Sequence, residues 1–222
     1  MVHFEQELAE LKGKLLSMAS HAEAAVRHSV QAVIHRDYEL GLRVRADDVI
    51  LDRLEVEIDE TAIELLTKAP MASDLRLITV AMKVSQNLER VGDEASKIAN
   101  RARDLSQEPP LKLAMDLPKF SQLALNMLRG ALDAFVNHDP AAARSLIPQD
   151  KEVDAMNKEI HRQLAHEMSQ NAETIARCLH LMVVAKSLER IADHAKNIAE
   201  EVVYLCEAQD IRHAGSGEAS AA

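Results

Sequence analysis

Aromatic side chains are scarce in this chain: only 2% of its 222 residues are Phe, Tyr or Trp, and Trp is absent. Strands and sandwich cores depend on aromatic and β-branched residues. The residues that dominate here, Ala, Leu, Glu, Lys and Arg, are strong helix formers. Glycine and proline, which break helices, number only six each. The composition therefore predicts an all-α protein.

The chain also lacks an excess of basic charge, because its formal net charge is −10. Nucleic-acid binders present basic surfaces, so we expect no nucleic-acid partner. Its two cysteines, Cys178 and Cys206, do not make a disulfide framework, and we expect Cys178 to be a buried free thiol. No apolar run of about 18 residues and no signal-peptide pattern occur, so we expect no membrane span and a cytoplasmic location.

Apolar residues between the prolines recur at helical spacing and predict six helices. Their expected ranges are 4–36, 39–68, 73–106, 118–138, 140–169 and 172–208. Ser73 and Asn171 are candidate N-caps, and Asp139 followed by Pro140 indicates another helix start. We expect Pro148 to kink or break the fifth helix, because proline lacks the N–H that a helix interior uses.

An internal repeat relates the two halves of the chain. Residues 88–99 recur as residues 188–199 with seven of twelve positions identical, and Asp37, Asp48 and Asp52 recur as Asp139, Asp150 and Asp154 at an offset of 102. The repeat predicts two tandem three-helix bundles. We place them at 1–106 and 118–209, with a linker at 107–117 and a disordered tail at 210–222.

Each half carries two acidic pairs at the i, i+4 spacing, which places both carboxylates on one helix face. The pairs are Asp48/Asp52, Glu89/Asp93, Asp150/Asp154 and Glu189/Asp193. On a helical wheel, Glu89 and Asp93 lie roughly 130° from the centre of their apolar face, at the margin of the core or on the surface. Clustered carboxylates without a nearby cysteine favour a hard cation: Mg²⁺, Mn²⁺, Ca²⁺ or iron.

A simpler interpretation is that these carboxylates meet solvent, with Asp93 paired to Lys97 and Asp154 to Lys158, both at i+4. The Glu-x-x-His motif of buried di-iron bundles does not stand beside these pairs. His194 directly follows Asp193 and reaches a metal only if the local geometry allows it. No catalytic nucleophile is legible, which disfavours a catalytic centre.

Three segments resemble the signature segments of the PhoU family, which regulates phosphate uptake in bacteria. They are Ala72-Ser73-Asp74-Leu75-Arg76-Leu77, Leu88-Glu89-Arg90-Val91-Gly92-Asp93 and Ser187-Leu188-Glu189-Arg190-Ile191-Ala192-Asp193. The resemblance runs nearly end to end. The second half departs from the usual Arg-Ile-Gly-Asp, since Ala192 replaces glycine, and this methyl group is expected to affect close packing rather than the carboxylates.

The resemblance implies metal ions, among Mg, Mn, Fe and Zn, at surface carboxylates. Carried over residue by residue, the ligands are Glu89, Asp93, Glu189, Asp193, Asp48, Asp52, Asp150 and Asp154. It also implies a homodimer that acts with the ATPase subunit of the phosphate ABC transporter. Its expected role is negative regulation of phosphate uptake and, through a sensor histidine kinase, of the phosphate-starvation response. The alternatives are a carboxylate-bridged metal hydrolase or oxidase and a purely structural helical scaffold.

Overall fold

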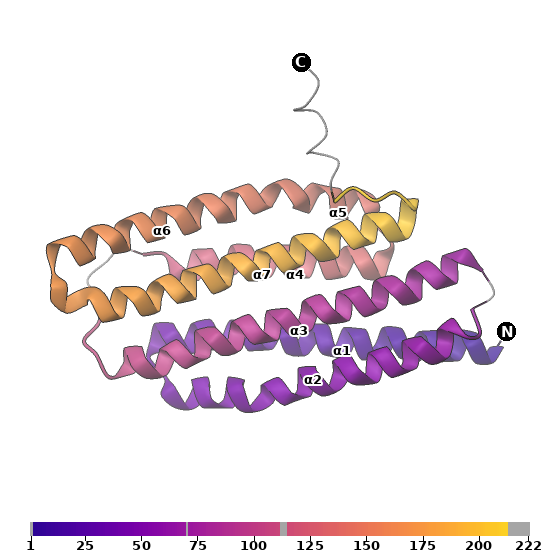
Figure 1. Cartoon of the computed structure of the whole chain (residues 1–222), viewed down its shortest axis with the longest axis horizontal. Coiled ribbons are helices and arrows are strands. Elements are labelled where there is room, and N and C mark those ends of the chain that lie inside the picture. Colours follow the sequence, from indigo (N-terminus) through magenta and orange to yellow (C-terminus); the bar gives the residue numbers. More distant parts are fainter. Residues whose placement is uncertain (1, 70, 112–114, 213–222) are drawn as a thin grey trace, which may run out of the picture.

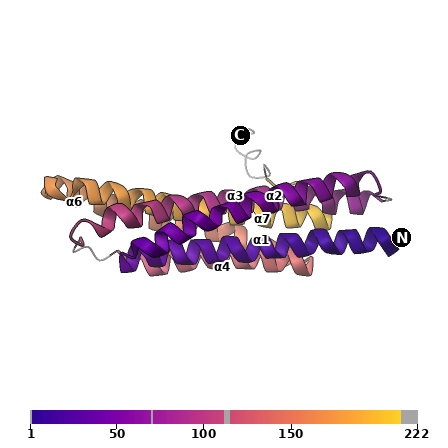
Figure 2. The same ribbon diagram turned by 90° about the horizontal axis from the view of Figure 1, so that it is seen from below.

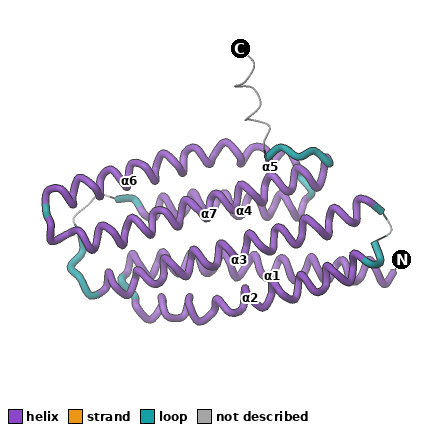
Figure 3. Tube along the Cα trace, viewed as in Figure 1, coloured by secondary structure: helices purple, strands orange, loops and turns teal. Residues whose placement is uncertain are grey.

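The computed structural model describes residues 2–69, 71–111 and 115–212, and every regular element within these ranges is a helix. The expectation of an all-α fold is confirmed. Residues 112–114 of the predicted linker and 213–222 of the predicted tail lie outside the described ranges. Figure 3 shows long helices joined by short loops. Across the described part of the chain, no helix is long and apolar enough to span a bilayer.

The first half contains three long helices, α1 (Val2–His35), α2 (Tyr38–Leu66) and α3 (Ala72–Ser106). The second half contains α4 (Leu117–Asn137), α5 (Pro140–Leu146), the 3₁₀ turn η1 (Ile147–Gln149) and α6 (Asp150–Gln170). The 3₁₀ turn η2 (Ala172–Thr174) then leads into α7 (Ile175–Glu207). The predicted helix 140–169 is therefore broken around Pro148, as its missing N–H leads one to expect.

Side-chain caps fix where several helices begin. Asp37 and Asp139, which the repeat makes equivalent, each accept a hydrogen bond of 2.9 Å from the backbone N–H three residues later. Asn171 accepts from the N–H of Glu173 and caps η2, as predicted. The predicted cap at Ser73 is wrong: α3 begins after Met71, which makes no side-chain cap hydrogen bond. Ser73 lies instead within the first turn of α3.

The helices form two layers (Figures 1 and 2). One layer runs in the order α2, α3, α7, α6, and the other contains α1 and α4. Within the first half, α1, α2 and α3 pack on one another, and α4 and α6 pack on α7 in the second. The halves meet where α3 packs against α7 and α1 against α4. Tandem helical bundles are thus confirmed, joined through the two helices that carry the repeated motif.

The core is aliphatic, as the scarcity of aromatic residues requires, and Phe120 is its largest fully buried side chain. Cys178 is a free, buried thiol, as expected. Two glycines allow close helix approach: a Cβ on Gly92 would lie 2.3 Å from Cδ1 of Leu51 on α2, and one on Gly41 would lie 3.0 Å from the carbonyl oxygen of Ala99. The close contact between α2 and α3 is therefore possible because Gly41 and Gly92 have no side chain.

Candidate functional site: two carboxylate clusters

The first-half pairs come together across the groove between α2 and α3. Asp48 and Asp52 lie on α2, Glu89 and Asp93 lie on α3, and their charges act on one another. Burial raises the pKa of Asp48, and the charges of Asp52 and Asp93 raise it further. Burial likewise raises the pKa of Glu89, to which Asp93 and Asp52 add. The charges of the two pairs therefore act on one another across α2 and α3.

Two acidic residues that the sequence reasoning missed belong to the same groove. Burial and then the charge of Asp59 raise the pKa of Glu55, and Asp52 and Asp93 also contribute. Glu55 follows Asp52 by three residues and Asp48 by seven, so helical spacing alone places it on their face. We call Asp48, Asp52, Glu55, Asp59, Glu89 and Asp93 the α2/α3 cluster.

The second-half pairs also come together, between α6 and α7. The pKa of Asp193 rises to about 6, first because the carboxyl is partly buried and second because of the negative charges of three neighbours, Glu189, Asp150 and Asp154. We call Asp150, Asp154, Glu189 and Asp193 the α6/α7 cluster. Lysines enter this cluster: Nζ of Lys196 lies 2.7 Å from Oδ2 of Asp150, and Nζ of Lys186 lies 2.5 Å from Oε2 of Glu189.

The expected surface position is wrong for two of the eight carboxylates. Glu189 exposes 7% and Asp150 8% of its surface, whereas Asp52 is exposed and the other five are intermediate. A helical wheel measures direction from the apolar face of one helix. The α7 helix packs against α3, α4 and α6, so residues well off its main apolar stripe are also covered.

The oxygen donors suit a hard cation, although they do not form a closed coordination shell. Carboxylates are the ligands that Mg²⁺ and Mn²⁺ favour, and the buried Oδ1 of Asp150 has no hydrogen-bond partner. Among residues 2–69, 71–111 and 115–212, however, no three His, Cys, Asp or Glu side chains are placed so that they could hold a metal together. As the side chains are placed, the carboxylates of the described residues therefore do not converge on one metal position.

His194 turns away from the carboxylates beside it. Its Nδ1 lies 3.0 Å from Oδ1 of Asn87 on α3, and burial lowers its pKa. The expected pairing of Asp93 with Lys97 is also replaced, because Lys97 donates to Glu94 at 2.8 Å. Glu94 is 4% exposed and also accepts from Arg190 of α7 at 3.2 Å. Polar bonds across α3 and α7 therefore join the two halves.

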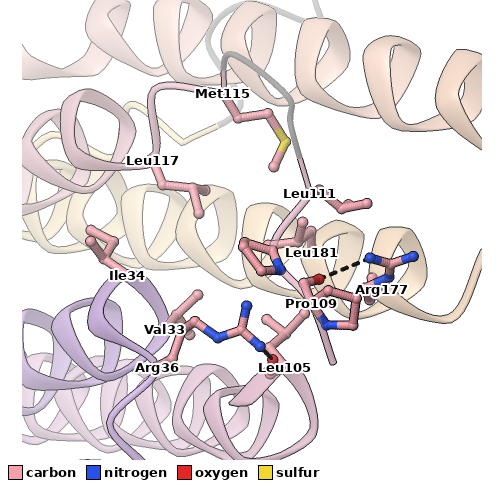
Figure 4. A pocket seen from close by; sticks show the side chains of 11 residues that line it. Val33, Ile34, Arg36, Leu105, Pro109, Leu111, Met115, Leu117, Arg177 and Leu181 are labelled. Carbon is pink, nitrogen blue, oxygen red and sulfur yellow. Dashed lines mark hydrogen bonds between the residues drawn. The ribbon is translucent and has the colours of Figure 1, made fainter. Parts of the chain in front are cut away.

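A separate pocket of about 170 Å³ lies where α1, the end of α3, the linker and α7 meet (Figure 4). Its lining is mostly aliphatic, with Leu105, Leu117 and Leu181 among the side chains. Arg177 donates to the carbonyl of Pro109 at 2.8 Å, and Arg36 donates to the carbonyls of Leu105 and Glu108. No carboxylate lines this pocket, so it does not match the sheltered metal cavity that the enzyme alternative requires.

The repeat has one packing difference beside the clusters. Gly92 in the first half faces Leu51, and the equivalent positions in the second half are Ala192 and Val153. The added methyl group of Ala192 therefore coincides with a shorter side chain at the position that Leu51 occupies in the first half. Both Ala192 and Val153 are buried.

Comparison with known proteins gives a consistent result. The family model for the PhoU domain matches residues 15–102 and 117–202. A protein from Rhizobium meliloti named phosphate-specific transport system accessory protein PhoU homolog is 39% identical over 92% of this chain and 87% of its own length. A homolog of the same name from Pseudomonas putida is 39% identical over 96% of this chain and 84% of its own length.

Two solved structures share the fold. The crystal structure of PhoU from Pseudomonas aeruginosa superposes with a TM-score of 0.90 at 38% identity, covering 93% of this chain and all of that one. The phosphate transport system regulatory protein PhoU from Streptococcus pneumoniae gives a TM-score of 0.86 at 27% identity, with 94% and 99% covered.

Proposed function

The chain belongs to the PhoU family, and we propose that it is a negative regulator of phosphate uptake and of the phosphate-starvation response. Its role in a phosphate transport system follows from the family, whose curated relatives are named accessory proteins. In this proposal the protein is an adaptor rather than an enzyme. It acts in the cytoplasm as a homodimer and contacts the ATPase subunit of the phosphate ABC transporter and a sensor histidine kinase.

The observation that carries the adaptor proposal is the pair of carboxylate clusters on the layer formed by α2, α3, α7 and α6. Asp93 and Asp193, one from each cluster, both line the groove between α3 and α7. One carboxylate of each cluster is therefore reached from this groove. A protein surface that carries acidic groups at two related places is suited to recognition, since electrostatic complementarity selects partners and orients them.

We propose that both clusters bind metal ions, with Mg, Mn, Fe and Zn as the candidates. Glu89, Asp93, Asp48 and Asp52 would hold the ion in the first half. Asp150, Asp154, Glu189 and Asp193 would do so in the second half. Burial, and after it the charges of neighbouring carboxylates, raise the pKa of Asp193 and Glu89, and a bound cation would offset both effects. Its chemistry would be structural and electrostatic: it would set the charge of the face that a partner meets.

A genetic experiment tests the regulatory role. Deleting the gene should derepress phosphate-starvation genes in phosphate-rich medium, and the wild-type gene should restore repression. A variant with Glu89, Asp93, Glu189 and Asp193 changed to alanine should fail to restore it, although it accumulates to the same level. Unchanged expression in the deletion strain would contradict the proposed function.

A pull-down separates the adaptor from a structural scaffold. The wild-type protein should retain the transporter ATPase subunit, and the same quadruple variant should lose it. As a matched control, Asp133, Glu152, Asp47 and Glu39 are also carboxylates but are exposed and outside both clusters. Changing these four to alanine should leave retention unchanged. Equal retention by all three proteins would show that the clusters do not serve partner binding.

A further inference from the structure

The two carboxylate clusters differ in the charges that surround them. Lys196 of the α6/α7 cluster corresponds to Ser96 in the first half, and Lys186 corresponds to Gln86, both at the offset of 100 that relates α3 to α7. Both lysines are replaced by neutral residues beside the α2/α3 cluster. The repeat thus conserves the carboxylates and changes the cations.

In the second half the two lysines form ion pairs with the two most buried carboxylates of the cluster. Lys196 lies 2.7 Å from Asp150 and Lys186 lies 2.5 Å from Glu189. Asp150 and Glu189 are only 8% and 7% exposed. The lysine side chains are themselves partly exposed, but each ammonium group lies against a buried carboxylate, where a bound cation would also lie. Each must move before a metal can take both oxygens of its carboxylate.

In the first half, fewer cationic side chains contact the carboxylates, and more carboxylates lie in the groove. Arg90 approaches Glu89 at 3.3 Å and Asp93 at 3.5 Å. Glu55 and Asp59 add two carboxylates, where the second half has the uncharged Asn157 and the histidine His161.

Two lysines of α3, Lys83 and Lys97, contact carboxylates at the boundary between the halves rather than those of the α2/α3 cluster. Lys83 lines the groove with Glu55, but its ammonium contacts Glu201 of α7 at 3.0 Å. Lys97 donates to Glu94, which Arg190 also contacts. Arg190, the counterpart of Arg90, therefore serves the boundary between the halves. The four repeated carboxylates thus have Arg90 beside them in the first half, with Glu55 and Asp59 further along the groove, whereas in the second half they have two lysines, and Lys196 also interacts with Glu200.

We propose that the clusters are unequal cation sites: the α2/α3 cluster binds a divalent metal more tightly, and Lys186 and Lys196 are built-in counter-ions that a metal must displace from the α6/α7 cluster. This inference rests on the proposed metal binding and adds an order of loading to it. Asp150 keeps a buried oxygen without a hydrogen-bond partner. The lysine pairing therefore leaves capacity for a metal once Lys196 moves.

Titration of metal-free protein with Mn²⁺ tests the order of loading, with bound metal measured by equilibrium dialysis and elemental analysis. We expect two classes of sites whose affinities differ by about tenfold or more, because one ion pair must be broken in the weaker class. Asp48→Asn with Glu89→Gln should remove the tight class. Asp150→Asn with Glu189→Gln should remove the weak class and leave the tight one.

Reciprocal exchanges test the role of the lysines. Lys186→Gln with Lys196→Ser should raise the affinity of the weak class by about tenfold. Gln86→Lys with Ser96→Lys should lower the affinity of the tight class by a similar factor, and this second variant keeps the test informative if the first unfolds. Lys12→Gln with Lys119→Ser removes the same charge away from both clusters and should change neither class.

The outcomes separate this inference from the proposed function. Equal affinities in the two halves, or affinities that the lysine exchanges leave unchanged, would overturn the unequal sites while metal binding remains. Absence of Mn²⁺ binding to the wild-type protein at millimolar metal would overturn both the metal-binding faces and the order of loading. The genetic test of the regulatory role is independent of either result.

Discussion

Asp193→Asn should stabilise the metal-free protein at alkaline pH, although it removes a predicted ligand. The pKa of Asp193 is raised from 3.8 to about 6. An acid whose pKa is raised in the folded state binds its proton more tightly there than in the unfolded chain. The contribution to stability is therefore greatest below about pH 4 and is lost as the pH rises toward 6. At pH 8 the folded protein carries the full cost of the ionised form.

The size of the effect follows from that shift. About two pKa units correspond to about 3 kcal/mol, and screening of this half-buried group by water reduces the cost to about 1–2 kcal/mol. Asparagine has nearly the same shape and no charge. We therefore expect the variant to gain about 1–2 kcal/mol in free energy of unfolding at pH 8, and close to nothing at pH 4.

Urea unfolding in EDTA at both pH values measures this difference. Asp133→Asn, on the exposed face of α4, is the matched control and should change stability little at either pH. Adding Mn²⁺ should reverse the order at pH 8, because the wild-type protein then gains stability by binding metal and the variant gains less. A variant no more stable than wild type at pH 8 in EDTA would refute the electrostatic reasoning.

Three further predictions concern an ion pair between the halves, a contact between helices and a helix cap, and each is measured by urea unfolding. Glu94→Ala should cost about 1–3 kcal/mol, because it removes the charged hydrogen bonds that Glu94 accepts from Lys97 and, across α3 and α7, from Arg190. Gly92→Ala should cost about 1–3 kcal/mol, because the new Cβ would overlap Leu51; adding Leu51→Val should recover much of the loss. Asp139→Ala should cost about 1 kcal/mol through loss of the cap on α5.

Each of these predictions has an outcome that contradicts it. A Glu94→Ala protein as stable as wild type would show that the ion pairs between the halves contribute nothing net. Failure of Leu51→Val to rescue Gly92→Ala would show that the overlap lies elsewhere. For the cap, Asp139→Asn is the control, since asparagine retains an oxygen that accepts the N–H of Ala142; equal losses for both substitutions would exclude capping as the cause.

Local patterns were enough to predict much of the fold. Helix type and approximate length follow from apolar spacing, and the caps at Asp139 and Asn171 follow from residue type. The break at Pro148 follows from a missing donor. Ser73 shows the limit, because a residue that is able to cap is not obliged to, and the chain begins α3 one residue earlier.

The carboxylate pairs were visible in the sequence, but their surroundings were not. The i, i+4 spacing and the repeat fixed which carboxylates share a helix face, and the same spacing would have included Glu55. Burial of Glu189 and Asp150, by contrast, depends on how many helices pack around α7 and α6. The spacing of apolar residues along one helix does not predict how many other helices pack against it.

The helical fold class, the duplication and the acidic pairs could be predicted from the amino-acid order, because they depend on residues close together in the chain. Which cation each carboxylate meets could not, because it depends on how distant helices pack. Arg90 and Arg190 are equivalent in the repeat, yet one approaches Glu89 and the other Glu94 across the boundary between the halves. That choice depends on the placement of α3 against α7, since an ion pair forms with whichever partner packing brings within reach.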